Sequence, residues 1–110
     1  MGELVKNVEH RVPFEVAGLV EYEEGQVNSL TLAQQPGCKM TVFAIDAGEG
    51  MSTHAAPGDA VAFVLEGTGQ FTIDGVTNEV PAGSAIVMPK DVPHAVKGIT
   101  AFKMLLVVVK

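Results

Sequence analysis

The sequence has few of the cysteines and basic residues on which disulfide-bonded, nucleic-acid-binding and membrane-binding proteins depend. Its 110 residues include no tryptophan, one cysteine and seven basic residues against thirteen acidic ones, for a net charge of −6. A single cysteine, Cys38, has no partner for an internal disulfide bond, which is typical of a reducing compartment. Basic residues this sparse do not make a surface for phosphates or anionic lipids, so we expect neither nucleic acid nor a membrane as partner.

Long apolar segments are also missing. The longest apolar run, 104–109, is far too short to cross a bilayer, and residues 1–14 lack the apolar core of a secretory signal. We therefore expect a cytoplasmic protein. Apolar residues nonetheless make up 47% of the chain, enough to support one folded domain over residues 1–110.

Helical periodicity is scarce. The chain instead consists of short apolar segments separated by turn residues, which indicates an all-β fold. Twelve Gly and six Pro divide the chain into short segments rich in Val, Ile, Thr and Phe. Residues 1–25 are predicted to form a polar leader with a short turn or strand at 15–21, and residues 26–110 a barrel. The expected strands cover 26–33, 38–46, a short segment ending at His54, 60–65, 70–74, 77–80, 84–88, 94–97 and 101–109.

Local patterns give two sharper predictions. Asp74-Gly75 is the strongest hairpin signal in the chain and is expected to join the strands on either side of it. In the segment 38–44 the even positions are all apolar, and strand alternation predicts that they face the interior; they are Cys38, Met40, Val42 and Ala44.

The segments 60–65 and 101–109 are apolar on both faces. A strand of this kind has to be covered on both sides, because an exposed apolar edge invites aggregation. We expect its outer face to pack on the N-terminal segment or on a second copy of the chain, which makes a homodimer the expected assembly.

Two stretches of the sequence follow the same plan. Residues 48–67 and 83–98 each begin and end with glycine, contain a proline corner and an apolar run, and carry one histidine, His54 or His94. A pair of imidazoles can bind a metal, hydrogen-bond a ligand or transfer a proton. The alternative is that both are interior histidines satisfied by water or by the backbone.

These stretches resemble the paired motifs of the cupin superfamily, G-x5-H-x-H-x3,4-E-x6-G and G-x5-P-x-G-x2-H-x3-N. The positions that agree with the two motifs are Gly48, His54, Gly67, Gly83, Pro89 and His94. The positions that depart from them are Ala56 for a histidine, Ala60 for the glutamate, Asp91 for a glycine and Gly98 for the asparagine. The resemblance covers about residues 38–109 and implies a jelly-roll barrel, the double-stranded β-helix of that superfamily.

The resemblance also implies a metal site that has lost half of its ligands. Cupins typically hold one divalent metal with three His and one Glu, and here His54 and His94 alone remain. Two protein ligands bind a metal loosely, so we expect no tightly bound cofactor, with one divalent transition-metal ion as the alternative. Asp59 stands beside the lost glutamate position, and strand parity points it away from the interior unless a bulge at 57–58 turns it inward.

Three functions remain open at this stage, and no catalytic residue is assigned. The leading expectation is that a small, partly apolar molecule binds inside the barrel. A metal-dependent oxygenase or isomerase that uses the two histidines is the alternative, and an interaction or sensor module is the third. The residues expected to line the site are His54, His94, Met40, Ala56, Ala60 and Met104, although the methionines fit equally well as core filler.

Overall fold

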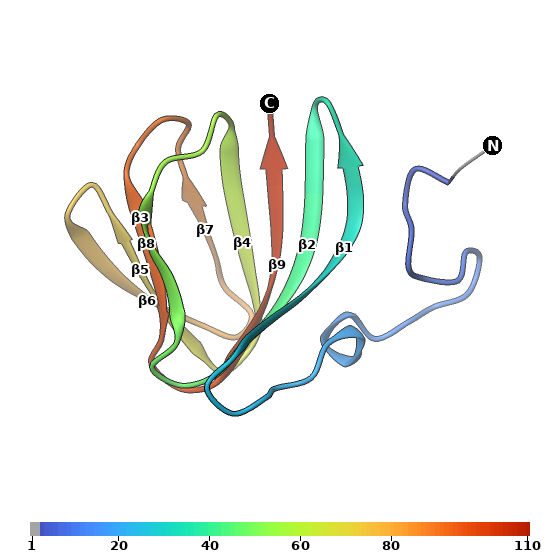
Figure 1. Cartoon of the computed structure of the whole chain (residues 1–110), viewed down its shortest axis with the longest axis horizontal. Helices are drawn as coiled ribbons and strands as arrows, with labels where there is room; N and C mark the ends of the chain where they lie inside the picture. The colour runs from blue at the N-terminus through green and yellow to red at the C-terminus, as the bar shows by residue number, and fades with distance from the viewer. Residues whose placement is uncertain (1–2) are drawn as a thin grey trace.

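A computed structural model describes residues 3–110 of the chain. Its elements in chain order are η1 (Val16–Leu19), β1 (Val27–Gln35), β2 (Cys38–Ile45), β3 (Gly50–His54), β4 (Asp59–Glu66), β5 (Thr68–Ile73), β6 (Val76–Pro81), β7 (Ala85–Met88), β8 (His94–Gly98) and β9 (Phe102–Val109). The strands form a five-stranded sheet in the order β1-β2-β9-β4-β7 and a four-stranded sheet in the order β3-β8-β5-β6 (Figure 1). Within residues 3–110, no helix is long and apolar enough to cross a membrane.

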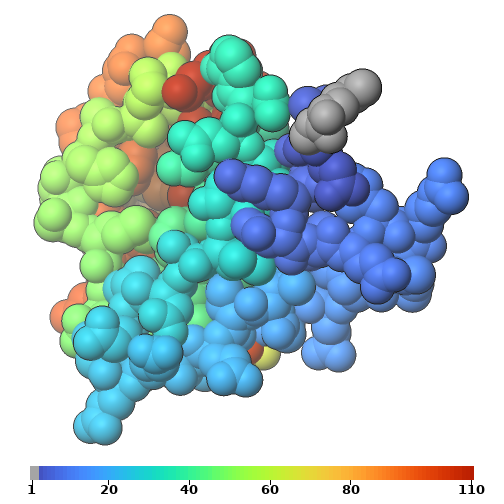
Figure 2. All heavy atoms as spheres, turned by 45° about the vertical axis from the view of Figure 1, so that its right-hand side comes forward, coloured from blue at the N-terminus to red at the C-terminus, as the bar shows by residue number. Residues whose placement is uncertain are grey.

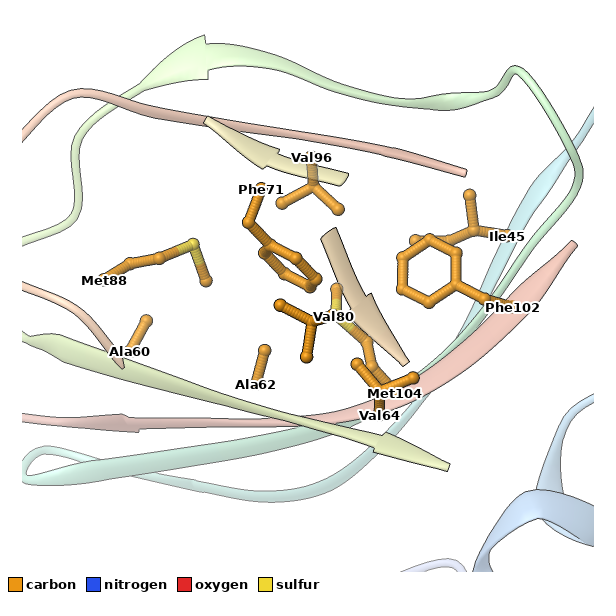
Figure 3. Close-up of a cluster of buried hydrophobic side chains, with 10 residues drawn as sticks. All are labelled: Ile45, Ala60, Ala62, Val64, Phe71, Val80, Met88, Val96, Phe102 and Met104. Carbon is orange, nitrogen blue, oxygen red and sulfur yellow. The ribbon is translucent and has the colours of Figure 1, made fainter. Parts of the chain in front are cut away.

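The two sheets form an all-β jelly roll, as the sequence predicts. All strand pairs are antiparallel, and β8 and β9 each lie between strands that are distant in sequence. Ten buried side chains fill the space between the sheets (Figure 3); they are Ile45, Ala60, Ala62, Val64, Phe71, Val80, Met88, Val96, Phe102 and Met104. Burial of this apolar surface is what holds the two sheets together.

The hairpin predicted at Asp74-Gly75 is confirmed. It joins β5 to β6, with Ile73 paired to Val76 across a two-residue turn. Asp74 and Gly75 have φ angles of 49° and 81°, and two consecutive left-handed residues are what a type I′ hairpin turn requires. The 15–21 segment also contains the expected turn, as the single 3-10 turn η1.

The predicted orientation of 38–44 is wrong. Val42 and Ala44 are fully buried, but they belong to a second cluster on the outer face of the five-stranded sheet, and Met40 packs against that cluster. The alternate residues Phe43 and Ile45 face the barrel core instead. The prediction failed because β2 is covered on both faces, so an apolar side chain does not indicate which face is the interior.

The second cluster is formed where the N-terminal segment crosses the outer face of the sheet. Its buried members are Val20, Leu32, Val42 and Ala44. Figure 2 shows the N-terminal residues, in blue, lying against the cyan surface of β1 and β2. The segment also bonds to the outer edge of β1, because the Lys6 amide donates to the carbonyl oxygen of Leu32 (2.7 Å) and the Asn7 side chain to that of Thr31 (2.7 Å). The sequence predicted cover by the N-terminal segment or a second copy for the outer face of 101–109, and Leu105 of 101–109, with Leu65 of β4, packs against this cluster.

A buried lysine fastens the N-terminal segment to the sheet. Lys103 on β9 is 9% exposed, and its Nζ donates to the carbonyl oxygen of Ala17 (2.7 Å) and lies 3.7 Å from Glu66 Oε1. The same ammonium lies 5.0 Å from the ring centre of Tyr22, whose hydroxyl donates to Glu66 (2.7 Å). Burial, and then the hydrogen bond to Glu66, raise the pKa of Tyr22 well above its ordinary value, so the phenol stays a neutral donor.

Candidate functional site

The two motif histidines meet on neighbouring strands of the four-stranded sheet. His54 is the last residue of β3, His94 is the first residue of β8, and the two are directly opposite in the register. A register shift between Met51 and His54 lengthens β3 locally and brings His54 opposite His94. Their ring centres are 4.5 Å apart with the planes at 71°.

Both rings are oriented by the same kind of hydrogen bond. His54 Nδ1 lies 2.8 Å from the carbonyl oxygen of Ser52, and His94 Nδ1 lies 3.1 Å from that of Val92. A carbonyl oxygen can only accept, so each Nδ1 carries the proton and donates it. In the neutral ring, each Nε2 is then left with a free lone pair, the form in which imidazole binds a metal or accepts a hydrogen bond.

The two histidines differ in their exposure. His94 is 4% exposed, whereas His54 is exposed to solvent. Burial lowers the pKa of His94, the bond to the Val92 carbonyl opposes that shift, and the neighbouring His54 lowers the pKa further. His94 is therefore a neutral imidazole at pH 7, next to a ring that solvent can reach.

The histidines lie at the end of the barrel where the loops 55–58, 74–75 and 89–93 meet, called the open end here; it is the upper end in Figure 1, toward which the sheets diverge. Backbone hydrogen bonds connect these loops. The amide of Asp91 donates to Ala56 (2.9 Å), and the amide of Asp74 donates to Pro93 (2.8 Å). Because these bonds fix the loops that flank both histidines, the pair is held by the scaffold.

Asp91 occupies the position where the cupin motif has glycine. The backbone conformation at Asp91 shows why glycine suits that position. Its φ is 63°, in the left-handed region that glycine enters freely and that Asp tolerates better than most residues. The structure therefore keeps the backbone conformation of the motif with a different residue.

The structure brings some of the other expected site residues to the open end and leaves others away from it. Ala60 is buried on the inner face of β4 opposite Met88, and Ala56 lies half-buried in the loop after β3. Met104 is fully buried but pairs with Val64, toward the other end of the core, so it acts as core filler (Figure 3). Met40 lies outside the barrel, in the cluster under the N-terminal segment.

Among residues 3–110, no third side chain joins the two histidines as a metal ligand. Asp59 points away from the core, as strand parity predicts, and its Oδ1 accepts the backbone amide of Lys90 (2.8 Å). Across residues 3–110, no group of three or more His, Cys, Asp or Glu side chains is arranged to hold a metal ion, and no pocket is found. The donor set at the open end is thus the two imidazole nitrogens.

The spacing of the rings does not by itself select a metal ion, because 4.5 Å between ring centres is also ordinary for an edge-to-face aromatic pair. The hydrogen bonds that the two rings make do suit a metal ion. Histidines that bind metals almost always donate their second ring N–H to a carboxylate, a carbonyl or water, and both do so to a carbonyl here.

Sequence reasoning missed the features that orient the pair. The hydrogen bonds to the carbonyls of Ser52 and Val92 depend on backbone geometry two residues before each histidine. No residue type in the sequence predicts them. Ile73, which lies beside His94 on β5, was also missed, although the β5–β6 hairpin that positions it was predicted. The cluster of Lys103, Glu66 and Tyr22 has no local sequence signal, because its members come from three distant segments.

Comparison with known proteins agrees with the fold. The family described as "Cupin domain" matches residues 41–110. A conserved protein of unknown function from Streptococcus pyogenes is 40% identical, with a TM-score of 0.96, over 99% of this chain and 96% of that one. A cupin superfamily protein from Desulfitobacterium hafniense is 30% identical, with a TM-score of 0.90, over 96% of each chain.

A cupin 2 conserved barrel domain protein from Leptotrichia buccalis is 43% identical, with a TM-score of 0.86, over 88% of this chain and 47% of that one. None of the curated proteins matches the sequence. The family match covers more than half of the chain. The chain therefore belongs to the cupin superfamily.

Proposed function

We propose that His54 and His94 together bind one transition-metal ion at the open end of the barrel. One observation carries the proposal: both rings donate Nδ1–H to a backbone carbonyl, and their centres lie 4.5 Å apart. The fixed tautomers leave a free lone pair on each Nε2, the form in which imidazole binds a metal. The sequence favoured a small molecule. We place the metal ion first because both imidazoles are oriented as metal ligands usually are, and no pocket for a molecule is found within residues 3–110.

Two protein ligands leave most of the coordination sphere to water or to oxygen atoms of a small molecule. Imidazole suits Zn²⁺, Ni²⁺, Cu²⁺ and Fe²⁺, whereas the absence of a carboxylate ligand among residues 3–110 disfavours Mg²⁺ and Ca²⁺. A bound ion would supply a Lewis acid that polarises an oxygen placed at the open positions. His94 holds its side of the site from within the core, and exposed His54 holds the solvent side.

The second candidate is the small, partly apolar molecule itself. Ile73 adjoins His94, and buried Met88 and Ala60 lie on the facing sheet at the same end of the barrel. A molecule bound there would have to donate hydrogen bonds, because each neutral Nε2 can only accept. Phenols, enols and amines have the required donor next to an apolar body.

The two candidates are separated by calorimetric titration of metal-free protein with Zn²⁺ and Ni²⁺. We expect one ion per chain with a dissociation constant on the order of micromolar, and at least about tenfold weaker binding in His54→Ala and in His94→Gln. His10→Ala is the matched control, because His10 is an exposed histidine in the N-terminal segment. Unchanged binding in both site variants would refute the metal site, and the absence of any binding to wild type would leave the second candidate.

A further inference from the structure

The loop 89–93 joins β7 to β8 and ends directly before His94. It closes on itself in one turn, because the amide of Val92 donates to the carbonyl oxygen of Pro89 (3.2 Å). The carbonyl oxygen of the same Val92 accepts the Nδ1–H of His94 (3.1 Å). The conformation of this loop therefore decides where the acceptor for the His94 ring lies.

The same loop also contacts the segment that follows the other histidine. The amide of Asp91 donates to the carbonyl oxygen of Ala56 (2.9 Å), two residues after His54. One loop thus holds the acceptor for His94 and bonds to the chain beside His54. Any displacement of the loop changes the position of the two rings relative to each other.

One side chain fastens this loop to the five-stranded sheet. Asp59, the first residue of β4, accepts the backbone amide of Lys90 at its Oδ1 (2.8 Å). Within residues 3–110, the other hydrogen bonds of the loop join backbone atoms, apart from the one that His94 donates. A hydrogen bond from an amide to a carboxylate is stronger than one between two neutral groups. Asp59 is therefore an anchor that can be removed without changing any residue of the loop.

We propose that Asp59 is a positioning residue for the metal site, which holds the loop 89–93 so that both imidazoles keep their observed arrangement. The inference rests on the proposed function, because it concerns the same two histidines. Asp59 stands next to Ala60, where the cupin motif has its glutamate, but its carboxylate bonds to the loop instead of facing the core. The carboxylate at this end of β4 thus serves the site from outside the barrel, without touching the ion.

Calorimetric titration of metal-free protein with Zn²⁺ separates the hydrogen bond of Asp59 from its charge. Asp59→Asn keeps an oxygen acceptor and loses the charge, whereas Asp59→Ala loses both. Replacing a residue that orients a metal-binding histidine typically weakens binding about 10–100-fold, so we expect Asp59→Ala to bind Zn²⁺ about tenfold more weakly than wild type. Asp59→Asn should bind within about twofold of wild type. Equal weakening in both variants would overturn the proposal, because the charge and not the bond would then be responsible.

Lys90→Pro removes the same hydrogen bond from the donor side and leaves the carboxylate in place. Proline suits this position, which is the second of the four-residue turn 89–92. We expect it to weaken Zn²⁺ binding as much as Asp59→Ala does, whereas Lys90→Ala, which keeps the amide, should bind as wild type does. Zn²⁺ binding by Lys90→Pro at the wild-type affinity would contradict the anchor.

Asp46→Ala is the matched control. The carboxylate of Asp46 also accepts backbone amides, at 2.8 and 2.9 Å, but Asp46 lies against Gly98, at the end of β8 opposite to His94. We expect a loss of stability in urea denaturation with no change in Zn²⁺ binding. A loss of Zn²⁺ affinity equal to that of Asp59→Ala would show a general effect of stability and would overturn the proposal.

Nitrogen NMR of the imidazole rings in metal-free protein, at about pH 7.5, tests the anchor independently of any ion. The spectra also show whether each variant is folded. His94 should carry its proton on Nδ1 in wild type and in Asp59→Asn, and should lose part of this preference in Asp59→Ala. If wild type binds no Zn²⁺, the proposed metal site fails while this measurement still decides the role of Asp59. An unchanged His94 ring in Asp59→Ala overturns the positioning role.

Discussion

His94 lies directly across from His54 with the ring centres 4.5 Å apart, and one of the two rings is buried while the other faces solvent. The buried ring has its tautomer and its neutral state fixed by the fold. The exposed ring has its tautomer fixed by a backbone carbonyl but remains accessible. This asymmetry makes His94 the member of the pair whose protonation is linked to folding.

The stability of the metal-free protein should therefore fall in acid because of His94. Burial lowers its pKa below the ordinary 6.5, so the unfolded chain binds the proton more readily than the folded one. Stability from this group is complete above about pH 6.5 and is lost as the pH falls from there toward the folded pKa. Thermal melts in a chelator, from about pH 7.5 to 5, should show this loss, and His94→Gln should make the dependence shallower. An unchanged slope in His94→Gln would contradict the assignment.

Ala56→His should tighten metal binding. Ala56 stands where the cupin motif has a second histidine, and it is half-buried in the loop beside the pair. A third imidazole completes the set of three protein ligands that open zinc sites use, so we expect at least about tenfold tighter Zn²⁺ binding by calorimetry. Ala55→His is the matched control, since Ala55 is the exposed preceding residue. Equal gains in both variants would show that the position does not face the ion.

Lys103→Met should loosen the N-terminal segment. The substitution removes the donor to the Ala17 carbonyl and leaves Glu66 without its ammonium partner, at a cost of about 1–3 kcal/mol in the free energy of unfolding. Urea denaturation measures the loss, and hydrogen exchange should show faster exchange around residues 16–22. Lys97→Met, at an exposed lysine on β8, should change the free energy by less than about 0.5 kcal/mol. Equal losses of stability in the two variants would show that Lys103 does not anchor the N-terminal segment.

Asp91→Gly should keep or raise stability, and Asp91→Val should lower it. The φ of 63° costs a β-branched residue about 1–2 kcal/mol more than glycine, while Asp tolerates it with a smaller penalty. The same urea measurements give the comparison. The ranking Gly, Asp, Val in decreasing stability is expected, and a valine variant as stable as wild type would mean that the loop 89–93 rearranges freely.

Much of the fold could be predicted from the sequence because its signals are local. Glycine and proline mark the turns, Asp74-Gly75 specifies its own turn type, and the two motif histidines sit at strand ends on either side of one ladder. The orientation of β2 could not be predicted in this way. Val42 and Phe43 are both apolar because each has a core to pack into, and alternation carries no information when both faces are covered.

The sequence predicted which residues form the site but not how all of them are arranged. The spacing of the motifs indicated that His54 and His94 converge. Strand parity pointed Asp59 away from the interior, as the structure has it, but the sequence left open a bulge that would turn it inward. The sequence could not show that Met104 lies deep in the core and Met40 outside the barrel, because both positions depend on which strands pair across the sheet. The carbonyls that fix the two tautomers likewise depend on backbone geometry that no single residue specifies.

The second cluster under the N-terminal segment lies on a different sheet from the two histidines. β2 and β9 lie between two apolar layers, one on each side of their sheet, so these two strands are packed on both faces. The histidines lie on the other sheet, at its rim. Ala56, in the loop next to that rim, stands where the cupin motif has a histidine, and the two sheets form without a histidine there. Residues at the rim can therefore change while the two apolar layers that hold the fold stay in place.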